Sequence, residues 1–268
     1  MVENIKNETN NVVTLKNLFL KYVGEKRDVD ALQNVNLDIK EGEFICILGP
    51  SGCGKSTLLN ILAGFIKPSS GEAIMDDEPI TGPDYHKGVV FQNPVLYPWL
   101  NVEDNVSFGL KMRNFPKNEI TELTKTYLEL VGLSGFEKNR PYELSGGMKQ
   151  RVSLAKTLVN KPRLILMDEP FGALDALTRH NMQKLIREIW NKTTNTVLLI
   201  THDVDEALEL ATRVLVMSCR PGTILKEFNT DFTFDILKNN NNSRCTKEYI
   251  DIREEILKII NNQCNELL

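Results

Sequence analysis

Short apolar runs alternate with longer segments of helical period along most of the chain. In residues 123–131, for example, apolar side chains recur every three or four positions, which is the spacing of one buried helix face. Strands that alternate with helices in this way predict an α/β core with a mainly parallel sheet and flanking helices. The best strand candidates are apolar runs bounded by turn residues, at residues 44–48, 89–91, 164–167, 196–201 and 214–217.

The two ends of the chain have different patterns. Residues 12–39 alternate apolar and polar positions, which predicts antiparallel strands beside the main sheet, and residues 67–72 predict a turn into another strand. Near the other end, isoleucines from Ile252 to Ile260 follow a short polar tract at the spacing of one amphipathic helix. We therefore expect residues 231–268 to form a C-terminal helical tail.

The charge of the chain argues against nucleic acid and anionic membranes as direct partners. Its 268 residues carry a formal charge of -4 and a pI of about 5.6, which gives no general attraction to phosphate-rich surfaces. No apolar run approaches the roughly 20 residues of a membrane-spanning helix, and residues 1–11 do not resemble a secretory signal. We expect a cytoplasmic protein that reaches the membrane only through a protein partner. The five cysteines are odd in number and lack paired metal-ligand spacing, so we expect free thiols.

A nucleotide-binding motif follows the strand candidate at residues 44–48. It matches the G-x-x-x-x-G-K-[ST] pattern and opens a helical segment at residues 57–63. Backbone N–H groups at such a turn bind phosphate oxygens, Lys55 can reach the β and γ phosphates, and the Ser56 hydroxyl can ligate Mg²⁺. A glycine-rich surface turn is the alternative, but the strand before it and the helix after it favour a phosphate loop. The predicted loop consists of Gly49, Pro50, Ser51, Gly52, Cys53, Gly54, Lys55, Ser56 and Thr57.

Two carboxylates end the strand candidate at residues 164–167. Asp168 and Glu169 come at its carboxyl end, where α/β sheets place their ligands. Asp168 would orient the Mg²⁺ shell, and Glu169 would act as general base on the attacking water. Such a pair more often caps a helix, but the phosphate loop in the same sheet favours the catalytic interpretation.

The segment Leu144-Ser145-Gly146-Gly147-Met148, followed by Lys149-Gln150-Arg151-Val152, resembles the signature motif of ABC ATPases. The resemblance covers nearly the whole chain. It implies a P-loop NTPase of the ABC type over residues 1–230, with an antiparallel β subdomain and a helical signature subdomain at about residues 93–160. The implied ligands are ATP and Mg²⁺.

The same resemblance implies roles for four further residues. Gln92 corresponds to the Q-loop glutamine, which reaches Mg²⁺ and the water, although a solvated loop amide is the alternative. Asp175 belongs to the D-loop, and His202 corresponds to the switch histidine, which could hydrogen-bond the γ-phosphate. Tyr22 resembles the aromatic residue that stacks on adenine, with core or surface packing as alternatives.

The resemblance also implies partners. Ser145, Gly146 and Gly147 begin a helix and form a second anion site, and in this family that site covers ATP held by a second subunit, which implies a homodimer. Met148 stands where many members have Gln. Met at that position, together with residues 96–100 and 217–222, resembles the importer branch for nitrate, sulfonate and taurine. This branch implies a permease that docks at residues 94–106, a solute-binding protein and a place on the cytoplasmic face of the membrane.

Two other functions are compatible with part of the sequence. A soluble ABC ATPase acting as a scaffold on DNA or ribosomes would need a coiled coil between the two motifs or a second cassette, but residues 56–144 are too short for the coiled coil. A P-loop kinase would have no use for residues 144–148. The transported solute stays open among nitrate, an alkanesulfonate, taurine and other small solutes, because a nucleotide-binding subunit does not contact it.

Overall fold

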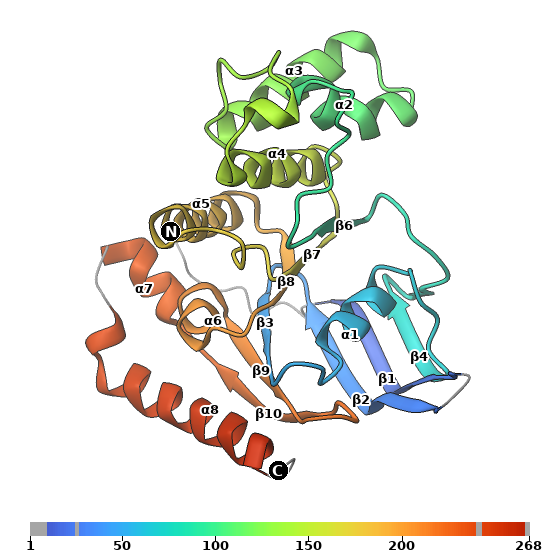
Figure 1. Cartoon of the computed structure of the whole chain (residues 1–268), viewed down its shortest axis with the longest axis vertical. Coiled ribbons are helices and arrows are strands. Elements are labelled where there is room, and N and C mark those ends of the chain that lie inside the picture. Colours follow the sequence, from blue (N-terminus) through green and yellow to red (C-terminus); the bar gives the residue numbers. More distant parts are fainter. Residues whose placement is uncertain (1–9, 25–26, 240–242, 266–268) are drawn as a thin grey trace. The chain divides into compact units, whose positions relative to one another are not determined.

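The computed structural model describes residues 10–24, 27–239 and 243–265 (Figure 1). The chain divides into two compact units. The first comprises Met1–Pro83 and Thr194–Leu268, and the second comprises Asp84–Thr193. Across the described residues, no helix combines the length and the apolar content needed to cross a bilayer.

The first unit contains the antiparallel sheet that the alternating pattern predicts. Strand β1 (Asn11–Tyr22) pairs antiparallel with β2 (Val29–Lys40) on one side and with β4 (Ser70–Met75) on the other. The short β5 (Glu78–Pro79) extends the sheet beyond β4. In the second half of β1, Leu18 and Leu20 are buried while Phe19 and Lys21 are exposed, so the apolar leucines define the inward face of the sheet.

A mainly parallel set of strands forms the centre of the first unit. Strand β3 (Phe44–Leu48) lies between β8 (Thr196–Ile200) and β9 (Arg213–Met217), parallel to both. All positions of β3 and β8 are buried, which explains why these strands have continuous apolar sequences. Strand β10 (Ile224–Asn229) adds an antiparallel edge next to β9.

Helices complete the first unit. Helix α1 follows β3, α6 follows β8, and the C-terminal helices come after β10 (Figure 1). The amphipathic pattern near the end of the chain forms α8, whose Tyr249 and Ile256 are buried. These helices are α1 (Lys55–Leu62), α6 (Val204–Leu210), α7 (Phe232–Asn239) and α8 (Lys247–Asn265), with a 3-10 turn at Ser243–Cys245.

The second unit combines two parallel strands with a helical group. Helix α4 packs against both α2 and α3 around buried apolar residues such as Val106, Leu128 and Val152. Asn101 caps α2, because its side chain accepts the N–H of Asp104 over 2.7 Å. The elements are β6 (Lys87–Val90), α2 (Val102–Met112), α3 (Lys117–Leu130), a 3-10 turn (Pro141–Glu143), α4 (Gly146–Leu158), β7 (Leu164–Asp168) and α5 (Ala176–Thr193).

Candidate functional site

The predicted phosphate loop connects β3 to α1 in the first unit. Lys55 is only 7% exposed, and its Nζ donates to the carbonyls of Gly49 over 2.7 Å and Pro50 over 2.9 Å. The ammonium group therefore lies inside the turn made by its own loop. Ser56 is exposed in the first turn of α1, where backbone N–H groups have no partner within the helix.

Two glycines give this loop its shape. Gly54 precedes α1 with φ of 102°, and a Cβ there would come within 2.8 Å of both the Ala31 carbonyl oxygen and a Leu32 methyl group. A Cβ at Gly49 would lie 2.9 Å from the Cys53 sulfur. A tight backbone turn at a helix N-terminus, with a lysine ammonium inside it, is a cradle of the kind that binds phosphate groups. The residues present therefore fit a nucleotide phosphate chain.

Tyr22, the predicted adenine-stacking residue, lies beside the same loop. Its hydroxyl is 3.3 Å from the hydroxyl oxygen of Thr57, and the side chain is 42% exposed. Of the two alternatives to stacking, burial in the core is therefore excluded. An exposed aromatic ring next to a phosphate loop is available for a planar base.

His202 is exposed between β8 and α6 in the first unit. The turn around it is well ordered. Asp203 caps α6 by accepting the N–H groups of Asp205 over 2.8 Å and Glu206 over 3.2 Å, and Thr201 accepts the Asp203 N–H over 3.1 Å. These bonds fix the backbone on both sides of the imidazole.

In the second unit, strand register brings three predicted residues to one edge. Strands β6 and β7 are parallel, with Val90 opposite Met167, so the chain reaches Gln92 and Glu169 at the same end. The Gln92 amide nitrogen lies 2.8 Å from where a Cβ on Gly172 would be, and the Gly172 N–H donates to the Glu169 carbonyl over 3.1 Å. Gln92, Glu169 and the start of the D-loop thus form one cluster, and Asp168 ends β7 beside it.

Carboxylate, amide and hydroxyl oxygens are the ligands that Mg²⁺ prefers. Asp168 and Gln92 supply the first two types in the second unit, and Ser56 supplies a hydroxyl in the first. Each unit by itself therefore supplies oxygen donors of a kind that fits Mg²⁺.

The predicted signature residues begin α4. Ser145 caps this helix, because its hydroxyl accepts the Met148 N–H over 3.3 Å. Ser145 and Gly146 are exposed, and a Cβ on Gly146 would meet nothing within 4 Å. Gly147 is different, since a Cβ there would lie 2.5 Å from a methyl group of Thr178. Packing within the chain therefore requires glycine at position 147 but not at 146.

Asp175 directly precedes α5 and has a structural role of its own. Its carboxylate accepts the N–H of Thr178 over 3.0 Å, which caps the helix. The backbone hydrogen bond from Thr178 lowers the pKa of the Asp175 carboxyl. The side chain is also exposed.

Sequence reasoning did not find two residues that support these loops. Gln150 of α4 is buried and donates from Nε2 to the Phe91 carbonyl over 3.1 Å, directly before Gln92. Arg220 donates from Nε and Nη2 to the Gly52 carbonyl, both over 3.2 Å. Both residues lie in segments that carry the family resemblance, but the contacts themselves join positions far apart in the chain.

Comparisons with known proteins agree with this geometry. The model of the ABC transporter family matches residues 32–172. The Taurine import ATP-binding protein TauB of Roseobacter denitrificans is 47% identical over 259 residues, which is 96% of each chain. The protein of the same name from Pelagibacter ubique is 48% identical over 241 residues, or 90% of this chain and 91% of that one.

Solved structures give the same result. The dimeric post-hydrolysis structure of an ATP-binding cassette with ADP and Pi has a TM-score of 0.72 and 34% identity, covering 82% of this chain and 99% of that one. The structure of cbiO1 from Clostridium perfringens, described as part of the ABC transporter complex cbiONQ, has a TM-score of 0.75 and 29% identity, covering 91% of this chain and 99% of that one. The chain therefore belongs to the ABC transporter family and has the fold of its ATP-binding cassettes.

Proposed function

We propose that this chain is the ATP-hydrolysing subunit of an importer for a small solute of the nitrate, sulfonate or taurine class. It acts as a homodimer on the cytoplasmic face of the membrane, with a separate permease and a solute-binding protein. The observation that carries the proposal is the 47% identity, over 96% of each chain, with a protein named for taurine import. Taurine is accordingly the first solute to test.

The chemistry follows from the residues at the two clusters. The phosphate loop binds ATP through its N–H groups and Lys55, and Ser56, Gln92 and Asp168 would hold Mg²⁺. When bound, this ion neutralises charge on the phosphates. Glu169 accepts a proton from the attacking water while the water oxygen bonds to the γ-phosphorus. The bond between the γ-phosphorus and the β-γ bridging oxygen then breaks, and ADP and phosphate leave.

A second copy of the chain completes each site. Ser145 and Gly146 are exposed at the start of α4, with open space around Gly146, so a nucleotide held by another subunit can approach this helix N-terminus. The γ-phosphate would then be bound from both sides, and its loss would remove attraction across the dimer. Hydrolysis in this way opens the dimer and drives the permease.

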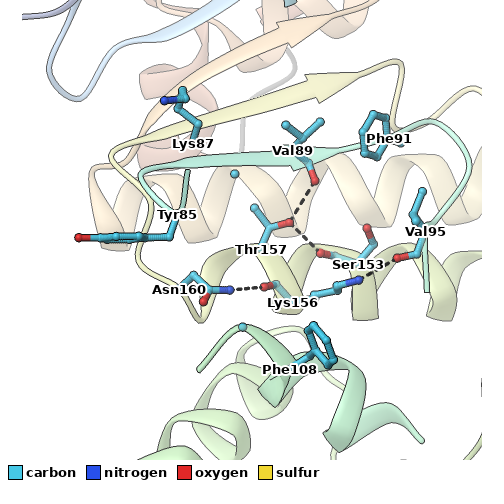
Figure 2. Close-up of a pocket in the computed structure, with 12 residues that line it drawn as sticks. Tyr85, Lys87, Val89, Phe91, Val95, Phe108, Ser153, Lys156, Thr157 and Asn160 are labelled. Carbon is cyan, nitrogen blue, oxygen red and sulfur yellow. Dashed lines mark hydrogen bonds between the residues drawn. The ribbon is translucent and has the colours of Figure 1, made fainter. Parts of the chain in front are cut away.

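A pocket in the second unit is the candidate docking site for the permease. It has a volume of about 250 Å³ and is lined by β6, the segment after it, α2 and α4 (Figure 2). Val95 and Phe91, which follow β6, form one wall, Phe108 of α2 forms another, and Ser153 and Lys156 face the pocket from α4. Of the predicted docking residues 94–106, Val95 lines this pocket, and α4 contributes further lining residues that the sequence did not predict.

The loop beside this pocket is held in one conformation. Asn105 is fully buried, accepts the Tyr97 N–H over 2.7 Å and donates to the carbonyls of Tyr97 and Leu100 over 3.1 and 3.2 Å. Trp99 is nevertheless 69% exposed. A large aromatic side chain on a fixed loop is suited to a protein partner, since it contributes much contact area at little entropic cost.

Lys156 gives the pocket a charge preference. Its ammonium donates to the Val95 carbonyl over 3.1 Å and lies 4.2 Å from the centre of the Tyr97 ring. Burial lowers the pKa of Lys156, which means that its charged form lacks part of its hydration. A carboxylate on a permease segment would pair with this ammonium group and compensate for the hydration that it has lost.

We predict that Val95→Arg detaches the chain from its permease. The arginine would fill the pocket and repel Lys156, so a membrane protein that co-purifies with the tagged wild-type chain in mild detergent should be lost. Uptake of labelled taurine by cells that carry the variant should fall at least about tenfold, which corresponds to roughly 1.4 kcal/mol of docking free energy.

The matched control is Met112→Arg, an equally exposed apolar position of the same unit that does not line the pocket. It should keep both the co-purifying protein and taurine uptake. Retention of both by Val95→Arg would contradict the docking site. If cells with the wild-type chain took up an alkanesulfonate or nitrate but no taurine, and Val95→Arg abolished that uptake, the solute would be reassigned.

A further inference from the structure

The end of β9 and the loop from β9 to β10 contact the phosphate loop at three positions. A Cβ at Gly49 would lie 3.1 Å from the Met217 carbonyl oxygen, Arg220 donates to the Gly52 carbonyl, and Gly222 packs on the Cys53 carbonyl. All of these residues belong to the first unit. Residues 217–222 also carry part of the resemblance to the importer branch, yet the proposed reaction gives them no role.

Arg220 controls the orientation of one peptide unit of the phosphate loop. Its Nε and Nη2 both donate to the Gly52 carbonyl oxygen over 3.2 Å. Because a peptide unit is planar, fixing this carbonyl also fixes the plane of the following Cys53 N–H. Gly52 has φ of 78° and no side chain, so its own backbone would otherwise be among the most mobile of the loop.

Gly222 fits against the next carbonyl. A Cβ at this position would come within 2.0 Å of the Cys53 carbonyl oxygen, so only glycine allows this approach. The same residue is hydrogen-bonded to β2 on both sides. Its N–H donates to the Ala31 carbonyl over 2.9 Å, and its carbonyl accepts the Gln33 N–H over 2.9 Å. The loop from β9 to β10 is thus anchored to β2 at the same residue that contacts the phosphate loop.

Helix α8 supports this loop from outside. The Gln263 side chain accepts the Cys219 N–H over 3.3 Å, and its backbone carbonyl lies 3.0 Å from the Cys219 sulfur, which donates to it. Near its other end, α8 is held on α6, because Tyr249 and Arg253 both donate to the Asp205 carboxylate over 2.9 Å. The tail thus links the helix that follows His202 to the loop that carries Arg220.

We propose that Arg220 is a positioning residue that holds the phosphate loop in its nucleotide-binding conformation, and that α8 supports it through Gln263. This inference rests on the proposed function, since it assumes that ATP binds at the phosphate loop. It gives the C-terminal tail a role in nucleotide affinity.

The first test compares nucleotide binding by the wild-type chain and two variants of Arg220. Arg220→Ala should weaken binding of a fluorescent ATP analogue about 3- to 10-fold, as expected for losing a charged donor near the surface. The KM for ATP should rise by the same factor with kcat within about twofold, because Arg220 does not touch the reacting atoms. Arg220→Lys keeps a cationic donor and should recover most of the affinity.

Gln263→Ala tests the support from α8 without removing any charge. It should weaken binding about two- to threefold, whereas Asn262→Ala, an exposed amide on the same helix, should leave binding unchanged. Wild-type affinity in Arg220→Ala would overturn the role of Arg220. Equal affinity in Gln263→Ala and Asn262→Ala would overturn the role of α8. A wild-type chain that binds no nucleotide would instead overturn the proposed function itself.

Discussion

At the scale of single residues, Glu169 is one of eight non-glycine residues in the described part of the chain whose φ is positive, and one of three among them that are neither Asn nor Asp. Its φ of 45° lies in the left-handed region, which costs a residue with a side chain about 1 kcal/mol or more. The Gly172 N–H holds the Glu169 carbonyl over 3.1 Å. Strain of this kind persists where the surrounding structure fixes a functional side chain, and at this position it fits the predicted general base.

Replacing Glu169 by Gln should separate binding from hydrolysis. The amide keeps the size of the side chain but cannot accept the proton of the attacking water, so phosphate release should fall roughly 10²- to 10⁴-fold. ATP binding should remain, and the variant should form a dimer in the presence of ATP that is visible by size-exclusion chromatography with light scattering.

Glu129→Gln is the matched control, because Glu129 lies on α3 in an exposed ion pair with Lys125. Its turnover should equal that of the wild type. Wild-type turnover in the Glu169 variant would mean that another residue is the base.

Local sequence predicts the residues of this site far better than their supports. The phosphate loop and the Asp168–Glu169 pair are contiguous and follow apolar strands, so composition and pattern are enough to find them. The contact from Arg220 to Gly52 spans 168 positions, and that from Gln150 to Phe91 spans 59. Such contacts depend on how strands are paired, which no short pattern encodes.

At the scale of elements, the strength of the local apolar pattern decides which helices and strands the sequence could predict. The strands β3, β7, β8 and β9 were predicted within one or two residues, because buried parallel strands are continuously apolar. Strand β10 was not predicted, since only Phe228 of its six residues is buried. Helix α7 has eight residues, too few to show a clear period.

The attachment of α8 to α6 is the element contact with the clearest electrostatic basis. Burial disfavours the charged form of Asp205, but hydrogen bonds from Arg253 and Tyr249 and the charges of Arg253 and Arg244 outweigh it, so its pKa is lowered. Tyr249 is only 1% exposed, and burial raises the pKa of its hydroxyl, which therefore stays protonated as a donor. Arg244, in the 3-10 turn before α8, forms an ion pair with Glu209 of α6.

This attachment should weaken in acid. A carboxyl whose pKa is lowered on folding contributes stability above its unfolded pKa, near 3.8, and loses it as pH falls through the native value. Asp205→Asn should therefore lower the melting temperature by about 2–4 °C at pH 7, which corresponds to a loss of roughly 1 kcal/mol in the free energy of unfolding. At pH 3 the difference from the wild type should shrink.

Asp251→Asn serves as the comparison, since Asp251 is exposed on α8. It should melt like the wild type at both pH values. A constant difference between Asp205→Asn and wild type from pH 7 to pH 3 would contradict the lowered pKa.

At the scale of the whole molecule, one chain carries two helix N-termini suited to phosphate. Helix α1 begins after Gly54 with Lys55 inside the loop, and α4 begins after Ser145, where Ser145 and Gly146 are exposed. If each reaction centre combines the first site of one subunit with the second site of another, damage to the two sites should be complementary. A site contained within one chain would not behave in this way.

Mixing two inactive variants tests this arrangement directly. Lys55→Ala removes the ammonium from the phosphate loop, and Ser145→Arg blocks the start of α4, so each homodimer should lack any complete centre. In a mixed dimer, the loop of the Ser145 variant meets the intact α4 of the Lys55 variant, which restores one centre. Random pairing makes about half of the dimers mixed, so an equal mixture should recover up to roughly a quarter of wild-type phosphate release. A mixture as inactive as its components would show that the two sites do not act across a dimer, because complementation requires each subunit to supply what the other has lost.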